Sequence, residues 1–452
     1  MLLIIRGAVF IWVTICFLFL QSPPPLQESI LARQSDESER TRDDRQRALT
    51  ILLAAGNQFA DQDPLKAARY FNRAGRLQLR LNSSSEAIAT FQKALDLIKD
   101  NSDSNERIDL LNGIATVYMS LSKCDEAQTY LTEAISSSEH KGYIAGQAES
   151  LLTLSRCQDF SDHALSIKTA QKSLELSESI GNRIGAARAY SNLSEFQMLS
   201  SNIMEAGESS EAALKIWREL NMPEEEASAL ISLGFLEYHK GAWQSCLSFL
   251  MQAQSLIDEK AEPYKMGQIN GGIAEAFIES GMPEIGLTKS LEALEYFRLA
   301  DDPRGVTIMT WDIGNSYLLL GNYAEALKAL QQALNEATAM KDPLVMAICH
   351  DFIGRTYSAS GDEISSLKHL EHAFNMYTQI GSPREAARTR ALMGQVYERQ
   401  GKIEKARHFF QTALAEFSKL ADRVNQSATL YALGRLELKT NNLDLAENYL
   451  QQ

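Results

Sequence analysis

Few side chains in this sequence stand at the spacings that catalysis or metal binding requires. The chain contains no P-loop, Rossmann glycine fingerprint, HExxH or GxSxG motif, and the adjacent glycines Gly271 and Gly272 lack a preceding strand. His369 and His372 are three residues apart and could share one helix face, but they lack a nearby third ligand. We interpret them as part of a partly exposed helix face. We therefore expect a chain that is not an enzyme, with no catalytic residue, no cofactor and no metal ion.

The cysteines give little sign of thiol chemistry. No CxxC pair occurs, and no histidines are grouped around the cysteines at zinc-ligand spacing. Apart from the first, they fall in four different segments of the chain, which favours buried structural thiols over a disulfide framework. The five are Cys16, Cys124, Cys157, Cys246 and Cys349.

Charge and composition exclude one class of partner and indicate a class of fold. The 44 Lys and Arg against 58 Asp and Glu give a net charge of −14, which repels the phosphate backbone, so we expect no nucleic acid partner. Only 10 Pro occur, and 45% of the residues are hydrophobic and 23% charged, as amphipathic helices require. Because a single core stops growing at roughly 250 to 300 residues, a chain of this length favours a linear array of helices.

The N-terminus has the layout of an export signal. Arg6 precedes an apolar run, residues 7–20, which a proline-rich break follows. This run is short for a membrane span of about 20 residues, although residues 1–5 are apolar too and leave an uncleaved anchor as the alternative. We expect a signal peptide or N-terminal membrane anchor over residues 1–22 and a charged flexible linker over 23–47. The chain is then exported: periplasmic, secreted or anchored at the outer face of the cytoplasmic membrane.

A small residue returns along the rest of the chain at intervals of 40, with one interval of 39. An aromatic residue often stands three positions after it, a small residue twelve after, a large apolar residue sixteen after and usually Ala nineteen after. Two antiparallel helices approach closely where both offer a small residue, and the large side chains fill the space beside them. The ten marker residues are Gly75, Ala115, Ser155, Ser194, Gly234, Ala274, Gly314, Gly354, Gly394 and Gly434.

Turn residues divide each unit into two helices. Gly321, Gly361, Gly401 and Asn441 suit a left-handed helix C-cap between the helices of one unit. Pro after Asp or Ser suits the first turn of the next unit. The third unit carries three extra residues after Ser155, so we expect an irregular loop there. An unmatched capping helix over 49–59 is expected before the first unit.

This pattern resembles the tetratricopeptide repeat family in a 40-residue form, over roughly residues 64–452 and most clearly in WDIGNSYLLLGNYAEALKALQQAL, residues 311–334. The resemblance implies an all-α, right-handed solenoid of about ten antiparallel helical hairpins over residues 48–452, with the last hairpin incomplete. It also implies a concave face, formed by the first helix of each hairpin, where an extended peptide or a partner helix lies.

Counting from the marker, positions one after, three or six before, and four or five after should point into that concave face. Aromatic residues gather in its middle and arginines toward its end, which would suit a partner segment both apolar and acidic. The alternative is that each Arg pairs with a Glu of the neighbouring repeat. The expected groove residues are Phe235, Tyr238, Glu275, Trp311, Asn315, Asp351, Arg355, Gln395, Arg399, Tyr431 and Arg435, with Arg69, Arg76, Arg80, His239 and Arg388 at equivalent positions.

These features predict a protein-protein interaction scaffold that binds a partner peptide or domain in the groove. The chain also resembles the N-terminal region of bacterial proteins that combine a signal segment, 40-residue tetratricopeptide repeats and a C-terminal caspase-like CHAT domain. That resemblance implies, as the alternative, the scaffold part of a longer protease, although none of that domain's elements stands in this chain. The open C-terminal end would then contact a following domain or, in a complete adaptor, a second copy.

Overall fold

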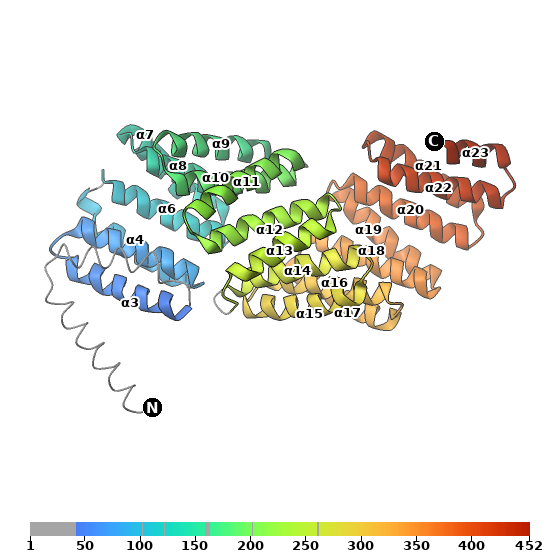
Figure 1. Ribbon diagram of the computed structural model, residues 1–452, viewed down its shortest axis with the longest axis horizontal. Coiled ribbons are helices and arrows are strands. Elements are labelled where there is room, and N and C mark those ends of the chain that lie inside the picture. The colour runs from blue at the N-terminus through green and yellow to red at the C-terminus, as the bar shows by residue number, and fades with distance from the viewer. Residues whose placement is uncertain (1–41, 102, 122, 159–162, 201, 260–261) are drawn as a thin grey trace, which may run out of the picture. The chain divides into compact units, whose positions relative to one another are not determined.

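The protein is built from α-helices alone over the residues that the structure, a computed structural model, describes: 42–101, 103–121, 123–158, 163–200, 202–259 and 262–452. These residues form 21 α-helices and one short 3-10 helix, with no strand (Figure 1). The all-α class expected from the sequence is confirmed.

The chain divides into two compact units. The first comprises residues 1–236 and 256–261, and the second residues 237–255 and 262–452. The helices of the first unit are α3 (Arg42–Phe59), α4 (Pro64–Arg80), α5 (Ser84–Leu97), α6 (Asn105–Ser120), α7 (Cys124–Lys141), α8 (Ile144–Gln158), α9 (His163–Ser179), α10 (Arg183–Leu199), α11 (Ile203–Glu219) and most of α12 (Pro223–His239), with the 3-10 helix η1 (Lys99–Asn101).

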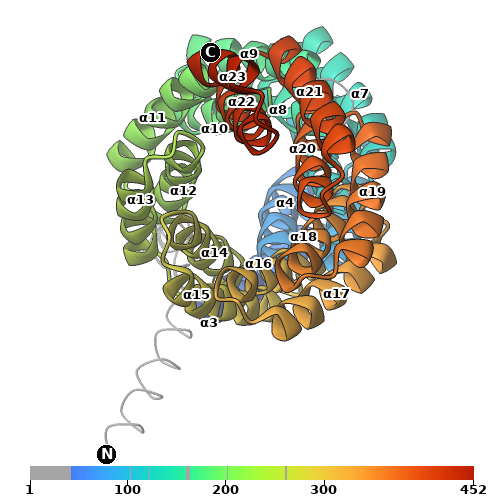
Figure 2. The ribbon, with the colours of Figure 1, turned by 90° about the vertical axis from the view of Figure 1, so that its right-hand side faces the viewer.

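The second unit consists of hairpins in which each helix packs against the next, and the even-numbered helices also contact one another. Within it, α14, α16 and α18 lie on the inner side and α15, α17 and α19 on the outer side (Figure 2). Its helices are α13 (Trp243–Leu256), α14 (Pro263–Glu279), α15 (Pro283–Leu299), α16 (Pro303–Leu319), α17 (Tyr323–Met340), α18 (Pro343–Ser360), α19 (Glu363–Gln379), α20 (Pro383–Arg399), α21 (Ile403–Lys419), α22 (Arg423–Lys439) and α23 (Leu443–Gln451).

The ten marker residues all lie on even-numbered helices, α4 to α22, as the first helix of each hairpin requires. A β-carbon on Gly314 would lie 2.7 Å from Leu330 Cγ, and one on Gly354 would lie 2.8 Å from Leu370 Cγ. In both hairpins the large side chain is the residue sixteen positions after the marker. The marker is small because this side chain fills the space where a β-carbon would stand.

The turns within the hairpins have the expected left-handed backbone. The φ angle is +76° at Gly321, +91° at Gly361, +69° at Gly401 and +61° at Asn441. Pro303 and Pro343 begin α16 and α18, and Asp302 and Asp342 cap these helices by accepting hydrogen bonds from first-turn backbone N–H groups. The turn and capping chemistry read from the sequence is confirmed.

The N-terminal boundary differs from the expectation. Helix α3 begins at Arg42, so residues 42–47, which we placed in the flexible linker, belong to a helix. Its Leu49 and Leu52 are buried against Tyr70 and Leu77 of α4, which confirms the capping helix and explains why it starts early. Residues 1–41, with the expected signal peptide and the rest of the linker, lie outside the described residues, and so do residues 159–162 in the third hairpin.

Two further findings concern the chemistry of the described chain. No helix in the described ranges combines the length and apolar character of a membrane span. Cys246 and Cys349 are buried thiols, and Cys124 and Cys157 are half-buried thiols.

Candidate functional site

The groove residues expected from the sequence lie on six successive first helices or their ends. Phe235, near the end of α12, belongs to the first unit and is half-buried. The second unit carries the other ten: Tyr238 on α12, Glu275 on α14, Trp311 and Asn315 on α16, Asp351 and Arg355 on α18, Gln395 and Arg399 on α20, and Tyr431 and Arg435 on α22.

The arginines of α18 and α20 pair with a buried carboxylate. Asp351 is fully buried, and its Oδ2 lies 2.6 Å from Arg355 Nη2 and 3.8 Å from Arg388 Nη2. Thr389 Oγ1 also donates a hydrogen bond to Asp351 Oδ1 at 3.1 Å. Asp351 therefore pairs with both arginines, and its one negative charge offsets one of their two positive charges.

The basic residues of α22 pair in the same way with a carboxylate of the preceding repeat. Glu398, whose side chain is 3% exposed, lies 2.7 Å from Arg435 Nη2 and 2.5 Å from Lys439 Nζ. Arg399 contacts Ser358 and lies 3.9 Å from Glu363. The structure thus shows the pairing between repeats that the sequence left as the alternative, as in Arg435 with Glu398, while Arg355 pairs with Asp351 of its own helix. An acidic partner for these arginines stays a prediction.

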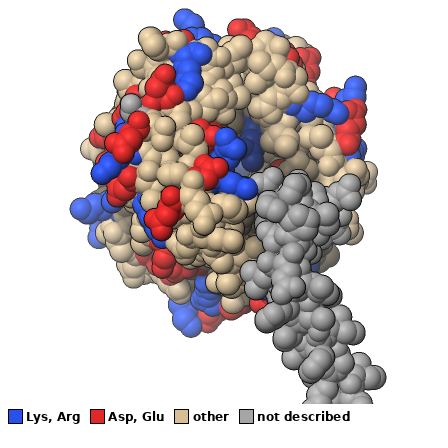
Figure 3. Space-filling model, turned by 90° about the vertical axis from the view of Figure 1, so that its left-hand side faces the viewer, with Lys and Arg blue, Asp and Glu red and all other residues tan. Residues whose placement is uncertain are grey.

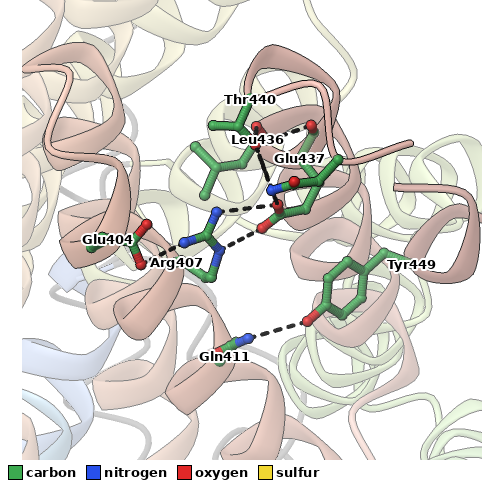
Figure 4. A network of polar contacts seen from close by, with 8 residues as sticks. Glu404, Arg407, Gln411, Leu436, Glu437, Thr440 and Tyr449 are labelled. Carbon is green, nitrogen blue, oxygen red and sulfur yellow. Dashed lines mark hydrogen bonds and ion pairs between the residues drawn. The ribbon is translucent and has the colours of Figure 1, made fainter. Parts of the chain in front are cut away.

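A related network ties the last hairpins together (Figure 4). Arg407 donates to both oxygens of Glu437, at 2.5 and 3.1 Å, and to Glu404 at 2.5 Å. These hydrogen bonds, from Arg407 first, hold the pKa of the buried Glu437 below its ordinary value. Gln411 of α21 donates to Tyr449 of α23 at 3.2 Å. The Arg407–Glu437 bonds join α21 to α22 and the Gln411–Tyr449 bond joins α21 to α23, so this network stabilises the array.

The aromatic side chains in the middle of the expected groove are partly covered by neighbouring side chains. Trp311 stacks edge-to-face on Phe352 with ring centroids 5.1 Å apart, and the Arg355 guanidinium lies 4.6 Å from the Phe352 ring. The Nε1 atom of Trp311 is buried and has no hydrogen-bond partner. Tyr238 packs against Trp243 at 5.3 Å. These rings present a fixed, partly covered aromatic surface.

Carboxylates gather between α14 and α16. Unlike the acids of the last repeats, they have no basic residue of the described chain paired with them. Burial, and then the charge of Glu279, raises the pKa of Glu275 to about 7. Burial raises the pKa of Asp312 well above its ordinary value, and the charges of Glu275 and Glu279 raise it further. Burial, with the same three acids, also raises the pKa of Tyr238. The four groups therefore lie close enough to repel one another's negative charge.

Sequence reasoning named only Glu275 and Tyr238 of this group. Glu279 stands five residues after Ala274, a position that the counting rule assigns to the groove, so the sequence did hold a signal for it. Asp312 stands two residues before Gly314, a position to which the rule gives no role. It joins the cluster because α16 packs against α14.

The two histidines that we weighed as metal ligands have a third neighbour. His350 Nδ1 of α18 lies 3.0 Å from His369 Nδ1, and the His350 ring lies 5.2 Å from that of His372. Burial, and then the charges of the two neighbouring imidazoles, lower the pKa of His350 to about 4. No group of three metal-ligating side chains in the described part of the chain is placed to hold an ion.

In the first unit the equivalent arginines are also paired. Arg69 contacts Glu106, Arg76 contacts Glu149, and Arg80 contacts Glu224 on α12 at 2.8 Å. Glu224 also lies 2.5 Å from Arg45 of α3, which is 2% exposed. Basic and acidic side chains are interspersed over the face shown in Figure 3.

Comparison with known proteins identifies the repeat. Two family models, each described as tetratricopeptide repeat, match residues 305–379 and 385–452, and residues 68–101. The chain carries tetratricopeptide repeats. The resemblance to proteins with a CHAT domain stays a prediction, and no curated protein sequence matches the chain.

Solved structures share the tetratricopeptide arrangement at low sequence identity. A Rap protein complexed with competence and sporulation factor has a TM-score of 0.53 and 15% identity, covering 76% of this chain and 99% of its own. Aspartyl phosphate phosphatase F from Bacillus subtilis has a TM-score of 0.52 and 10% identity, with coverages of 79% and 94%. A signal transduction ATPase with a tetratricopeptide repeat sensor from Pyrococcus horikoshii has a TM-score of 0.52 and 18% identity, with coverages of 74% and 52%. These likenesses concern the fold.

Proposed function

We propose that this chain is a protein-interaction scaffold that binds a linear peptide segment of a partner along the first-helix face of its second unit. The observation that carries the proposal is a set of polar groups on α14 and α16 whose charge or hydrogen-bonding capacity the fold leaves unused. Glu275 and Asp312 have no ion-pair partner among the described residues, and Trp311 Nε1 has no acceptor. In the following repeats, on α18, α20 and α22, the charged groove residues form ion pairs. The unpaired acids therefore distinguish α14 and α16 from the rest of the groove.

The fold supports the same role. A stacked array presents the first helices of successive hairpins side by side, which gives an extended peptide a long surface with side-chain positions at regular intervals. The Rap protein of similar fold was crystallised with competence and sporulation factor. The proposed role is binding without catalysis.

Selection of linear peptides against the purified full chain tests this proposal. Random peptides displayed on phage are selected on the immobilised protein, and the enriched peptides are synthesised with a fluorescent label. Their dissociation constants are then measured by fluorescence anisotropy for the wild type and for Asn315→Ala combined with Glu275→Ala. We expect the double variant to bind at least about tenfold more weakly, because it loses two polar contacts in the groove.

A matched control lies on the outer face of the same unit. Gln331 and Lys328 are exposed on α17, and Gln331→Ala with Lys328→Ala changes the same number of side chains away from the groove. We expect this variant to bind the peptides as the wild type does. Enriched peptides that bind the groove variant and the wild type equally would contradict the proposal.

A further inference from the structure

Three carboxylates of the second unit face one another without a cation. Glu275 and Glu279 lie one turn apart on α14, and Asp312 lies on the adjacent α16. No Lys, Arg or His in the described ranges forms an ion pair with any of them, although many of the described acids have such a partner. Asp312 is buried, Glu275 is half-buried and Glu279 is exposed. Burial and the neighbouring negative charges raise the pKa values of Glu275 and Asp312.

In the last repeat, the positions one and five residues after the marker carry basic residues that pair with an acid. Arg435 and Lys439 stand one and five residues after Gly434, and they contact Glu398 of the preceding repeat. Glu275 and Glu279 stand one and five residues after Ala274, and Tyr238 takes the place of Glu398 in the preceding repeat. The sixth repeat thus carries two acids where the tenth carries two cations, opposite a phenol that supplies no positive charge.

A second observation points to a missing ligand. Asp312 is 2% exposed, and its Oδ2 atom has no hydrogen-bond partner. A buried carboxylate oxygen without a partner destabilises a fold by roughly 1 to 3 kcal/mol or more. Asp351 Oδ2, which is also buried and without a hydrogen-bond partner on the next first helix, differs in having two arginines beside it, with Arg355 Nη2 at 2.6 Å and Arg388 Nη2 at 3.8 Å. The Asp312 site resembles the Asp351 site with its arginines taken away.

The chemistry of the donor set favours a guanidinium over other cations. A metal ion is disfavoured because no three ligating groups converge at coordination geometry in the described residues. A guanidinium offers five N–H donors in a plane, which suits several carboxylates spread over two helices. Its face also stacks on an aromatic ring, and Tyr238 stands beside the acids.

We propose that Glu275, Glu279 and Asp312 together bind the side chain of an arginine in the partner peptide. This inference rests on the proposed function and adds the residue by which the peptide is recognised. The arginine supplies the positive charge that the sixth and seventh repeats lack. It therefore fixes where along the groove the peptide lies.

A double-mutant cycle on the selected peptides tests the inference. Each arginine of an enriched peptide is replaced in turn by citrulline, which keeps the shape of the side chain and removes its charge. Binding to the wild type is compared with binding to Glu275→Gln combined with Asp312→Asn, by fluorescence anisotropy. We expect one citrulline replacement to weaken binding to the wild type by about tenfold to a hundredfold and to have little effect on the variant.

Controls separate this effect from general charge and from misfolding. Glu284→Gln combined with Glu292→Gln removes the same number of negative charges from the outer helix α15, and we expect it to keep the full citrulline effect. Circular dichroism and the melting temperature confirm that the neutralised chain is folded. An arginine-to-lysine replacement should weaken binding less than citrulline does, because it keeps the charge and loses the planar fork. Free L-arginine tests whether the side chain alone suffices, and we expect it to compete only at concentrations far above those of the peptide.

The outcomes distinguish the two proposals. Peptides that depend on the groove but contain no arginine, or that lose equal affinity on the wild type and the neutralised variant, would overturn the arginine site and leave the scaffold in place. If no enriched peptide depends on the groove, the proposed function itself fails. Competition by free arginine at the peptide's own concentration range would instead identify a small-molecule site and overturn the inference.

Discussion

At the scale of single residues, the expected groove residues differ in whether their charges have ion-pair partners. The sequence placed Arg435 and Arg355 correctly on first helices, but it could not say that Glu398 and Asp351 neutralise them. A partial signal did exist: several pairs of opposite charges that touch between repeats stand 37 or 38 residues apart, just under one period, as in Arg69 with Glu106 and Arg304 with Asp342. Asp312 gave no such signal because its neighbours in the fold carry the same charge.

The histidine cluster should make the stability of the second unit depend on pH. His350 keeps a pKa of about 4 in the fold, against about 6.5 in the unfolded chain, since burial and the imidazoles of His369 and His372 disfavour its charged form. Lys368 adds to the repulsion on His369. Below about pH 6.5 the unfolded chain therefore binds protons that the folded chain does not, and the free energy of unfolding falls as the pH falls toward 4.

The variant His350→Phe tests this dependence. Phe fits because Phe71 stands at the same distance before the marker in the first repeat. Between about pH 7.5 and pH 5, we expect urea denaturation of the wild type to show a loss of about 1 to 2 kcal/mol that the variant lacks. His408→Phe, at an exposed histidine of α21, serves as the control and should keep the wild-type loss. An unchanged slope in His350→Phe would contradict the prediction.

At the scale of helices, the hairpin code was readable because it repeats. At five marker glycines an added β-carbon would meet the large residue sixteen positions later, and every hairpin turn that is described in full has a left-handed residue, so these copies reinforced one another. The start of α3 at Arg42 was missed because a single charged stretch offers no copies for comparison. It is helical because Leu49 and Leu52 pack against α4, a tertiary contact that overrides the polar local sequence.

The turn between α18 and α19 gives a clean test of this code. Gly361 has a φ of +91°, and a β-carbon there would meet no other atom, so only backbone strain opposes a side chain. We expect Gly361→Ala to lower the free energy of unfolding by about 1 to 2 kcal/mol. Thermal and urea denaturation measure the change.

A matched substitution in the opposite direction is available in the same unit. Ala421 also lies in the left-handed region, with a φ of +53°. Ala421→Gly should leave stability unchanged or raise it, because it relieves the strain that Gly361→Ala introduces. Equal losses in the two variants would show that the backbone angle is not the cause.

At the scale of the whole first unit, the structure contains a contact that a nearest-neighbour array does not require. Glu224, at the start of α12, pairs with Arg45 of α3 and Arg80 of α4, and the partners in the first pair are 179 residues apart. The sequence could not predict it, because the contact depends on how far the stacked helices curve within this unit. Small rotations between repeats, added over several hairpins, decide whether these side chains meet.

Removing this contact should loosen the beginning of the chain. Arg45 is 2% exposed, so Glu224→Gln leaves a buried guanidinium without this countercharge, and we expect a loss of about 2 to 3 kcal/mol in stability. Hydrogen exchange should accelerate in α3 and α4 and stay unchanged in α14 to α18. Glu225→Gln removes the same first-turn charge of α12 and is the control. Equal acceleration in both variants would point to the helix dipole instead.

The same pair of contacts has a mechanical consequence. A stack held only by adjacent repeats extends like a spring, and each repeat yields in turn when the ends are pulled. A bridge from Glu224 to Arg45 and Arg80 shortens the path that carries load, because tension on α3 passes straight to α12 without loading the hairpins between them. The first unit should therefore resist stretching up to one threshold force and then lengthen abruptly when the bridge breaks.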